Sequence, residues 1–233
     1  IVWQTVSVAL QPSEDEGAGH KDAQTSEAPI FKNQYSKYRI LMLFLIIIFV
    51  YVGLEGSING FLPSVFITQL KTSSYIASLS TTVFWIAMLC GRIAIGWIVR
   101  RVNYERYLIA SILTGLIFFI LLTQFNNVIV CYALIFGLGC GLSAIYSITM
   151  VYANHTFPGM ERTVTSSITA FAGIGAAVFP FVIGFGMDHF TPKQVLWIMV
   201  LFNTVLLAVF LTIYISLARI RMGQRDKQSV PMN

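Results

Sequence analysis

The stretch RILMLFLIIIFVYVGLEGSINGFLPSVFI, from Arg39 to Ile67, is apolar along almost its whole length, and after Arg39 its one charged side chain is Glu55. A helix needs about 20 such residues to cross a hydrocarbon layer about 30 Å thick. Five further stretches meet the same criterion: Ser74 to Val99, Arg106 to Thr123, Val128 to Ala153, Thr163 to Met187 and Val195 to Ala218. Backbone in contact with lipid must bond to itself, so we expect six transmembrane helices in an all-α polytopic membrane protein.

Composition supports a membrane protein, because 56% hydrophobic and 11% charged residues are too apolar a mixture for a soluble domain. We divide the chain into a linker (1–38), a transmembrane unit (39–219) and a basic cytoplasmic tail (220–233). The first ten residues, IVWQTVSVAL, are apolar enough to end a preceding helix. We therefore expect the chain to be a fragment of a longer protein.

Basic residues predict the orientation in the membrane. If the linker is cytoplasmic, Lys71 and Lys193 lie outside, and the inner side holds twelve basic residues: Lys21, Lys32, Lys37, Arg39, Arg100, Arg101, Arg106, Arg162, Arg219, Arg221, Arg225 and Lys227. This asymmetry follows the positive-inside rule and places both termini in the cytoplasm. The tail lies directly below a span, which favours contact with anionic lipid over nucleic-acid binding. The sequence does not choose between the plasma membrane and an endomembrane.

Glu55 is the most informative polar residue, since it lies about 24 Å along the first span from its cytoplasmic end by helical rise. An acidic residue at this depth by default marks a substrate or proton pathway. Tyr51, Glu55 and Asn59 recur every fourth residue and so form one polar stripe. A carboxyl group on this stripe can bind and release a proton during transport. The alternative is a protonated Glu55 that bonds a neighbouring helix and serves only structure.

Two aromatic residues extend the candidate site. Trp85 follows Thr81 and Thr82 in the second span, and Tyr146 lies among serines in the fourth. An aromatic ring beside hydroxyl groups suits stacking on a sugar, although aromatic residues at helical spacing are also typical of a core. The sequence lacks a metalloprotease motif and metal-ligand spacing among its three histidines and three cysteines. We therefore predict no enzyme activity, no catalytic residues, no cofactor and no metal.

Three segments together resemble the C-terminal half of a major facilitator transporter. YVGLEGSINGF at Tyr51 to Phe61 resembles the opening helix of that half in the fucose-permease-like branch. FWIAMLCGRIAIGWIVRR at Phe84 to Arg101 resembles the next helix and loop, and GAAVFPFVIG at Gly175 to Gly184 resembles the fifth helix. The combination is most similar to fungal members of the bypass-of-stop-codon type.

The resemblance implies a twelve-helix fold in which two six-helix halves enclose a cavity that opens alternately to each side, often for proton-coupled sugar uptake. The present chain would form one half of that bundle, and an N-terminal half or another half-unit would complete it. The family's loop motif falls on Gly91, Arg92, Gly96, Arg100 and Arg101. Here Arg100 occupies the usual acidic position, which puts the family's charged latch in doubt.

Arg92, Arg101, Glu105 and Arg106 could still form such a latch with the linker or with neighbouring helices. The alternative is that these residues only anchor the loop in the cytoplasm.

We therefore predict transport of a small polar organic solute, with a sugar as the favoured class. Tyr51, Asn59, Trp85 and Tyr146 would contact the solute, while Glu55 also changes its protonation. Two alternatives remain open at this level. The first alternative is that the protein exports apolar compounds. The second is that it is a truncated half that does not transport and acts as an assembly partner.

Overall fold

The computed structural model describes residues 34–98 and 102–228, and these ranges form seven α-helices with short connections. The helices are α2 (Gln34–Leu70), α3 (Ser74–Ile98), α4 (Tyr104–Gln124), α5 (Val128–Leu142), α6 (Ile145–Thr156), α7 (Glu161–His189) and α8 (Pro192–Gln228). With α5 and α6 counted as one span, 6 helices are long and apolar enough to cross a membrane. The predicted all-helical membrane fold is thus confirmed.

The helix ends differ from the predicted limits at both edges of the chain. α2 begins at Gln34, so the end of the predicted linker is already helical, while residues 1–33 lie outside the described part. α8 continues to Gln228, so most of the predicted tail extends the last helix. The loop residues Arg100 and Arg101 also lie outside the described part.

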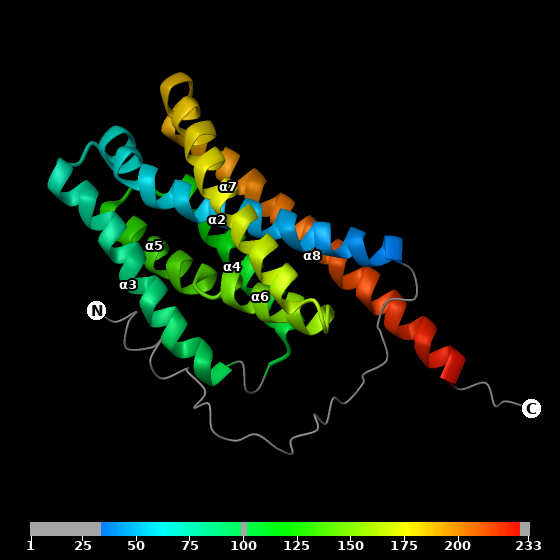
Figure 1. The fold of residues 1–233 in the computed structure, drawn as a ribbon. Coiled ribbons are helices and arrows are strands. Elements are labelled where there is room, and N and C mark those ends of the chain that lie inside the picture. The colour runs from blue at the N-terminus through cyan, green and yellow to red at the C-terminus, as the bar shows by residue number, and fades with distance from the viewer. Residues whose placement is uncertain (1–33, 99–101, 229–233) are drawn as a thin grey trace, which may run out of the picture.

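α2 forms the centre of the bundle and packs against α3, α6, α7 and α8 (Figure 1). Its buried side chains, among them Leu45, Val50 and Tyr51, lie on several sides of the helix, as expected of a helix surrounded by other helices. α3 differs because it leaves an apolar face uncovered, with Ile93 65% and Trp97 82% exposed. Residues of α3, α6, α7 and α8 can therefore meet side by side on the surface of α2.

Glycines permit the closest helix contacts in this bundle. At Gly175 of α7, a Cβ atom would collide with the backbone carbonyl of Phe49 on α2. On α5, a Cβ atom at Gly139 would lie 2.8 Å from the carbonyl oxygen of Phe84 on α3. Substitution at either position would require backbone to move.

The fourth span is broken, which corrects the prediction of one continuous helix from Val128 to Ala153. α5 ends at Leu142 and α6 begins at Ile145. Between them, Ala144 adopts φ −119° and ψ 7°, outside the helical region. The last carbonyl groups of α5 therefore lose their helical donors and need partners from elsewhere in the bundle.

Candidate solute-binding groove

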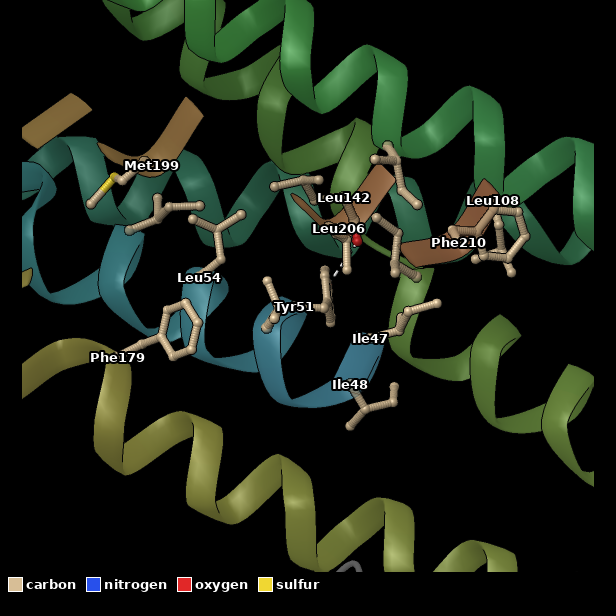
Figure 2. Packing of buried hydrophobic residues seen from close by; sticks show 14 of the residues in the cluster. Ile47, Ile48, Tyr51, Leu54, Leu108, Leu142, Phe179, Met199, Leu206 and Phe210 are labelled. Atoms are coloured by element: carbon tan, nitrogen blue, oxygen red, sulfur yellow. Dashed lines mark hydrogen bonds between the residues drawn. The ribbon is translucent and has the colours of Figure 1, made fainter. Parts of the chain in front are cut away.

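Side chains from two other helices satisfy carbonyl groups at the break in the fourth span. Tyr51 on α2 donates its hydroxyl hydrogen to the carbonyl oxygen of Leu142 at 2.8 Å (Figure 2). Arg92 on α3 donates from Nε to the carbonyl oxygen of Ser143 at 3.1 Å. Both bonds join parts of the chain far apart in sequence, so the break is stabilised by tertiary contacts.

Arg92 also faces Glu55 on α2. Its terminal nitrogen lies 3.7 Å from Oε1 of Glu55, and the two side chains are 50% and 16% exposed. That distance is an ion pair but exceeds a good hydrogen bond, so both groups retain bonding capacity. The pair offsets an otherwise costly acidic group inside the span.

Gly91 allows α3 to reach the break. A Cβ atom at this position would lie 2.7 Å from the Cβ atom of Ser143 and 2.8 Å from the carbonyl oxygen of Cys140. Ser143 is buried and bonds the same carbonyl group of Cys140 through its hydroxyl, at 2.9 Å. The absence of a side chain at Gly91 thus places the next residue, Arg92, beside the break.

An open groove of about 520 Å³ lies beside this pair. Its volume falls in the range of about 300–1,000 Å³ that is typical of small-molecule sites. α2, α3, α6 and α7 supply its lining, which consists of Val52, Glu55, Arg92, Tyr146, Ser147, Thr169, Ala172, Gly173 and Ala176. The lining combines an ion pair, a phenol and two hydroxyl groups with small apolar residues.

Pro180 leaves one backbone carbonyl group of α7 without its usual donor. It lies inside α7 and has no N–H group, so the carbonyl group of Ala176, one turn earlier, lacks its usual helical donor. The side chains that line the groove include both hydrogen-bond donors and hydrogen-bond acceptors for a polar solute.

In residues 34–98 and 102–228, no three His, Cys, Asp or Glu side chains form a group that could hold a metal ion.

The structure brings together only part of the predicted site. Glu55 and Tyr146 line the groove. Asn59 and Trp85 instead form a pair of their own, in which Trp85 Nε1 donates to Asn59 Oδ1 at 2.9 Å. Asn59 lies one turn beyond Glu55 on α2, about 6 Å away by helical rise.

Tyr51 occupies a different environment from the one predicted. The residue is 1% exposed and packs among apolar side chains such as Ile47, Leu54 and Leu206 (Figure 2). Its hydroxyl group is bonded to the break, so it is not available to a solute in this conformation. The geometry supports a structural role for Tyr51 beside the groove.

The residues predicted for the loop motif also lie in different environments. Gly91 and Arg92 serve the break and the groove, while a Cβ atom at Gly96 would meet nothing within 4 Å. Near the start of α4, Glu105 accepts a hydrogen bond from the hydroxyl of Tyr152 at 2.8 Å, which joins α4 to α6. The described part thus places Arg92 at the groove, where its ion pair is with Glu55.

Three groove residues were missed or misassigned from the sequence. Arg92 was assigned to the loop motif, although it is the basic residue inside the second span and Glu55 the acidic residue inside the first. Thr169 was not singled out, yet Thr165, Thr169 and Gly173 recur every fourth residue and form a small, polar stripe on α7. Ser147 was noted only as a neighbour of Tyr146.

Within the described residues, six membrane-length helices and an open polar groove define an integral multi-pass membrane protein with a site of solute size. The sequence matches the Major Facilitator Superfamily over residues 43–229, and the chain belongs to that family. It is 29% identical over 161 residues to the glucose/mannose transporter GlcP of Bacillus subtilis (strain 168). The match covers 69% of this chain and 40% of that protein, which is less than half of the relative's length.

Proposed function

We propose that this chain is one half of a transporter that moves a small polar organic solute, with a sugar as the favoured class, across the membrane. The groove carries this proposal, because it gathers Glu55, Arg92 and Tyr146 within the transmembrane unit. Family membership and a sugar-transporting relative support the same reading. A transporter of this kind needs no enzymatic group.

In this proposal the solute lies at the groove between this half and a second six-helix half. Tyr146 stacks on the solute, and Ser147 and Thr169 exchange hydrogen bonds with its hydroxyl groups. The pair formed by Asn59 and Trp85 borders the site one turn along α2. The two halves rock around the bound solute and expose it alternately to each side.

Glu55 is the proposed coupling residue. It is the acidic group of the groove, and its ion pair with Arg92 leaves it 16% exposed, so a proton can reach it. A carboxyl group that gains and loses a proton can link solute movement to a proton gradient. Both termini are cytoplasmic in the orientation that the basic residues predict.

The test uses the natural full-length protein in membrane vesicles with radiolabelled glucose and mannose. Glu55→Gln should abolish accumulation driven by a pH gradient while solute exchange at equal pH continues. Asp188→Asn is the matched control, because Asp188 is exposed at the end of α7. Normal pH-driven accumulation in Glu55→Gln would overturn the coupling role. Transport of apolar cations in place of sugars would favour efflux.

A further inference from the structure

The guanidinium group of Arg92 contacts two different parts of the bundle, one through Nε and the other through a terminal nitrogen. Nε donates to the carbonyl oxygen of Ser143, and the terminal nitrogen faces Glu55. The guanidinium is planar and its donors have fixed relative directions, so a shift at one end alters the geometry at the other. A single side chain therefore spans the distance between the groove's acidic group and the break in the fourth span.

The break between α5 and α6 depends on side chains of other helices, so a movement of those side chains can alter it. Its two flanking carbonyl groups, those of Leu142 and Ser143, bond side chains and so depend on α2 and α3. α6, which follows the break, carries Tyr146 and Ser147 into the groove. A change in either bond would thus alter the position of two groove residues.

We propose that Arg92 is a positioning residue that transmits the charge of Glu55 to the break between α5 and α6. The proposal rests on the proposed function, in which Glu55 changes charge during transport. When Glu55 is ionised, it holds the guanidinium against the carbonyl group of Ser143. When a proton neutralises Glu55, Arg92 is released, the carbonyl group loses its donor, and α6 shifts relative to α5.

Few other ionisable groups surround Glu55. On its own helix the neighbour is Tyr51, and α3 contributes Arg92. α6 contributes Tyr146, while the residues that α7 adds to the groove carry no ionisable side chain. Tyr107 of α4 lies near Tyr51. Glu55 is accordingly the one acidic group among the groove residues, and Arg92 is its opposite charge.

The test compares two cysteine reporters in the natural full-length protein. Ser147→Cys reports on α6 after the break, and Gly173→Cys reports on α7 across the same groove, where a Cβ atom has open space. Cys90 and Cys140 are replaced by serine in both. A membrane-impermeant maleimide is applied at acidic and alkaline pH. The ratio of the two labelling rates removes the effect of pH on thiolate formation that the two thiols share, and Glu55→Gln shows what remains of it.

With Arg92 present, this ratio should change roughly five- to tenfold between the two pH values, as for two sites coupled at the weak end of the usual range. Glu55→Gln and Arg92→Gln should each make the ratio independent of pH. Arg92→Lys should do the same, because an ammonium group keeps the charge but not the two-ended geometry. Tyr51→Phe removes the other bond to the break and should change the ratio while preserving its pH response.

A pH response that persists in Arg92→Lys and Arg92→Gln would overturn the proposal, as would a pH-independent ratio in the parent protein. If Arg92→Gln does not fold, Arg92→Lys decides the question, because it keeps the charge and Glu55 can still titrate. Failure of the proposed function gives a separate signature, namely normal pH-driven accumulation in Glu55→Gln. The two proposals can therefore fail independently.

Discussion

Two kinds of helix irregularity occur in this bundle, and they behave differently. α2 and α7 contain Pro63 and Pro180 within the helix, yet both are continuous, from Gln34 to Leu70 and from Glu161 to His189. The fourth span contains no proline, yet it breaks after Leu142. Proline content therefore does not locate the break.

The difference follows from the number of carbonyl groups that need a partner. A proline inside a helix frees the carbonyl group of the residue four positions earlier. For Pro63 this is Asn59, and the hydroxyl of Thr81 lies 3.4 Å from its oxygen. A full break frees several carbonyl groups and requires donors from other helices, which Tyr51 and Arg92 supply. Both irregularities thus take donors from another helix. The carbonyl group of Asn59 takes one donor from α3, whereas the break takes two, from α2 and α3.

The largest expected effect is from Arg92→Gln, which removes a donor to the break and also leaves Glu55 without its ion partner. We expect the free energy of unfolding of the natural protein in detergent to fall by about 2 to 3 kcal/mol, less than for a fully buried pair because Arg92 is half exposed. Arg106→Gln is the matched control, since Arg106 is exposed at the start of α4.

The double variant Glu55→Gln/Arg92→Gln sharpens this result. It removes the unpaired acidic group along with Arg92, so it should recover part of the lost stability. The remaining loss then measures the bond to Ser143. No recovery would mean that the ion pair contributes nothing and that the carbonyl bond accounts for the whole effect.

A smaller loss is expected from Gly91→Ala. The added Cβ atom would lie 2.8 Å from the backbone oxygen of Cys140, which is too close for a real contact, so α3 must move away from the break. We expect a loss of about 1 to 2 kcal/mol in the same unfolding assay, as for other overpacked sites. Gly96→Ala on the same helix meets open space and should be neutral or slightly stabilising. Equal effects at the two positions would contradict the close approach at Gly91.

Sequence predicted the helices well because membrane spans depend on length and apolar composition, which are local properties. The second span was predicted as Ser74 to Val99 and the structure gives Ser74–Ile98. The break in the fourth span was not predictable in the same way. GLGCGLSA permits a break, but donors on α2 and α3 stabilise it.

The candidate site was only partly predictable. A polar stripe on one helix identified Glu55, but the same periodicity included Tyr51, which the structure buries against the break. The spacing of residues along a helix shows which of them share a face, but it does not show which other helices that face contacts. The pairing of Glu55 with Arg92 was within reach of the sequence, since the two residues lie at similar distances on either side of the connection at Lys71.

Tyr51→Phe tests the other donor to the break and should cost about 1 kcal/mol, because it removes one hydrogen bond and leaves the carbonyl group of Leu142 buried without a donor. Tyr214→Phe is a suitable control, as Tyr214 is 39% exposed on α8. The assay is again unfolding in detergent. A loss as large as that of Arg92→Gln would show that the two donors are equivalent and that charge adds nothing at the break.

The smallest effect is expected where a proline frees a carbonyl group without breaking the helix. If Thr81 compensates for Pro63, then Thr81→Val should cost about 0.5 kcal/mol in the parent protein, the low end for a single long hydrogen bond. In a Pro63→Ala background the restored N–H group bonds Asn59 instead, so Thr81→Val should cost almost nothing. This double-mutant cycle isolates the pair. An equal cost of Thr81→Val in both backgrounds would mean that the hydroxyl acts elsewhere, and the carbonyl group freed by Pro63 would then need another donor.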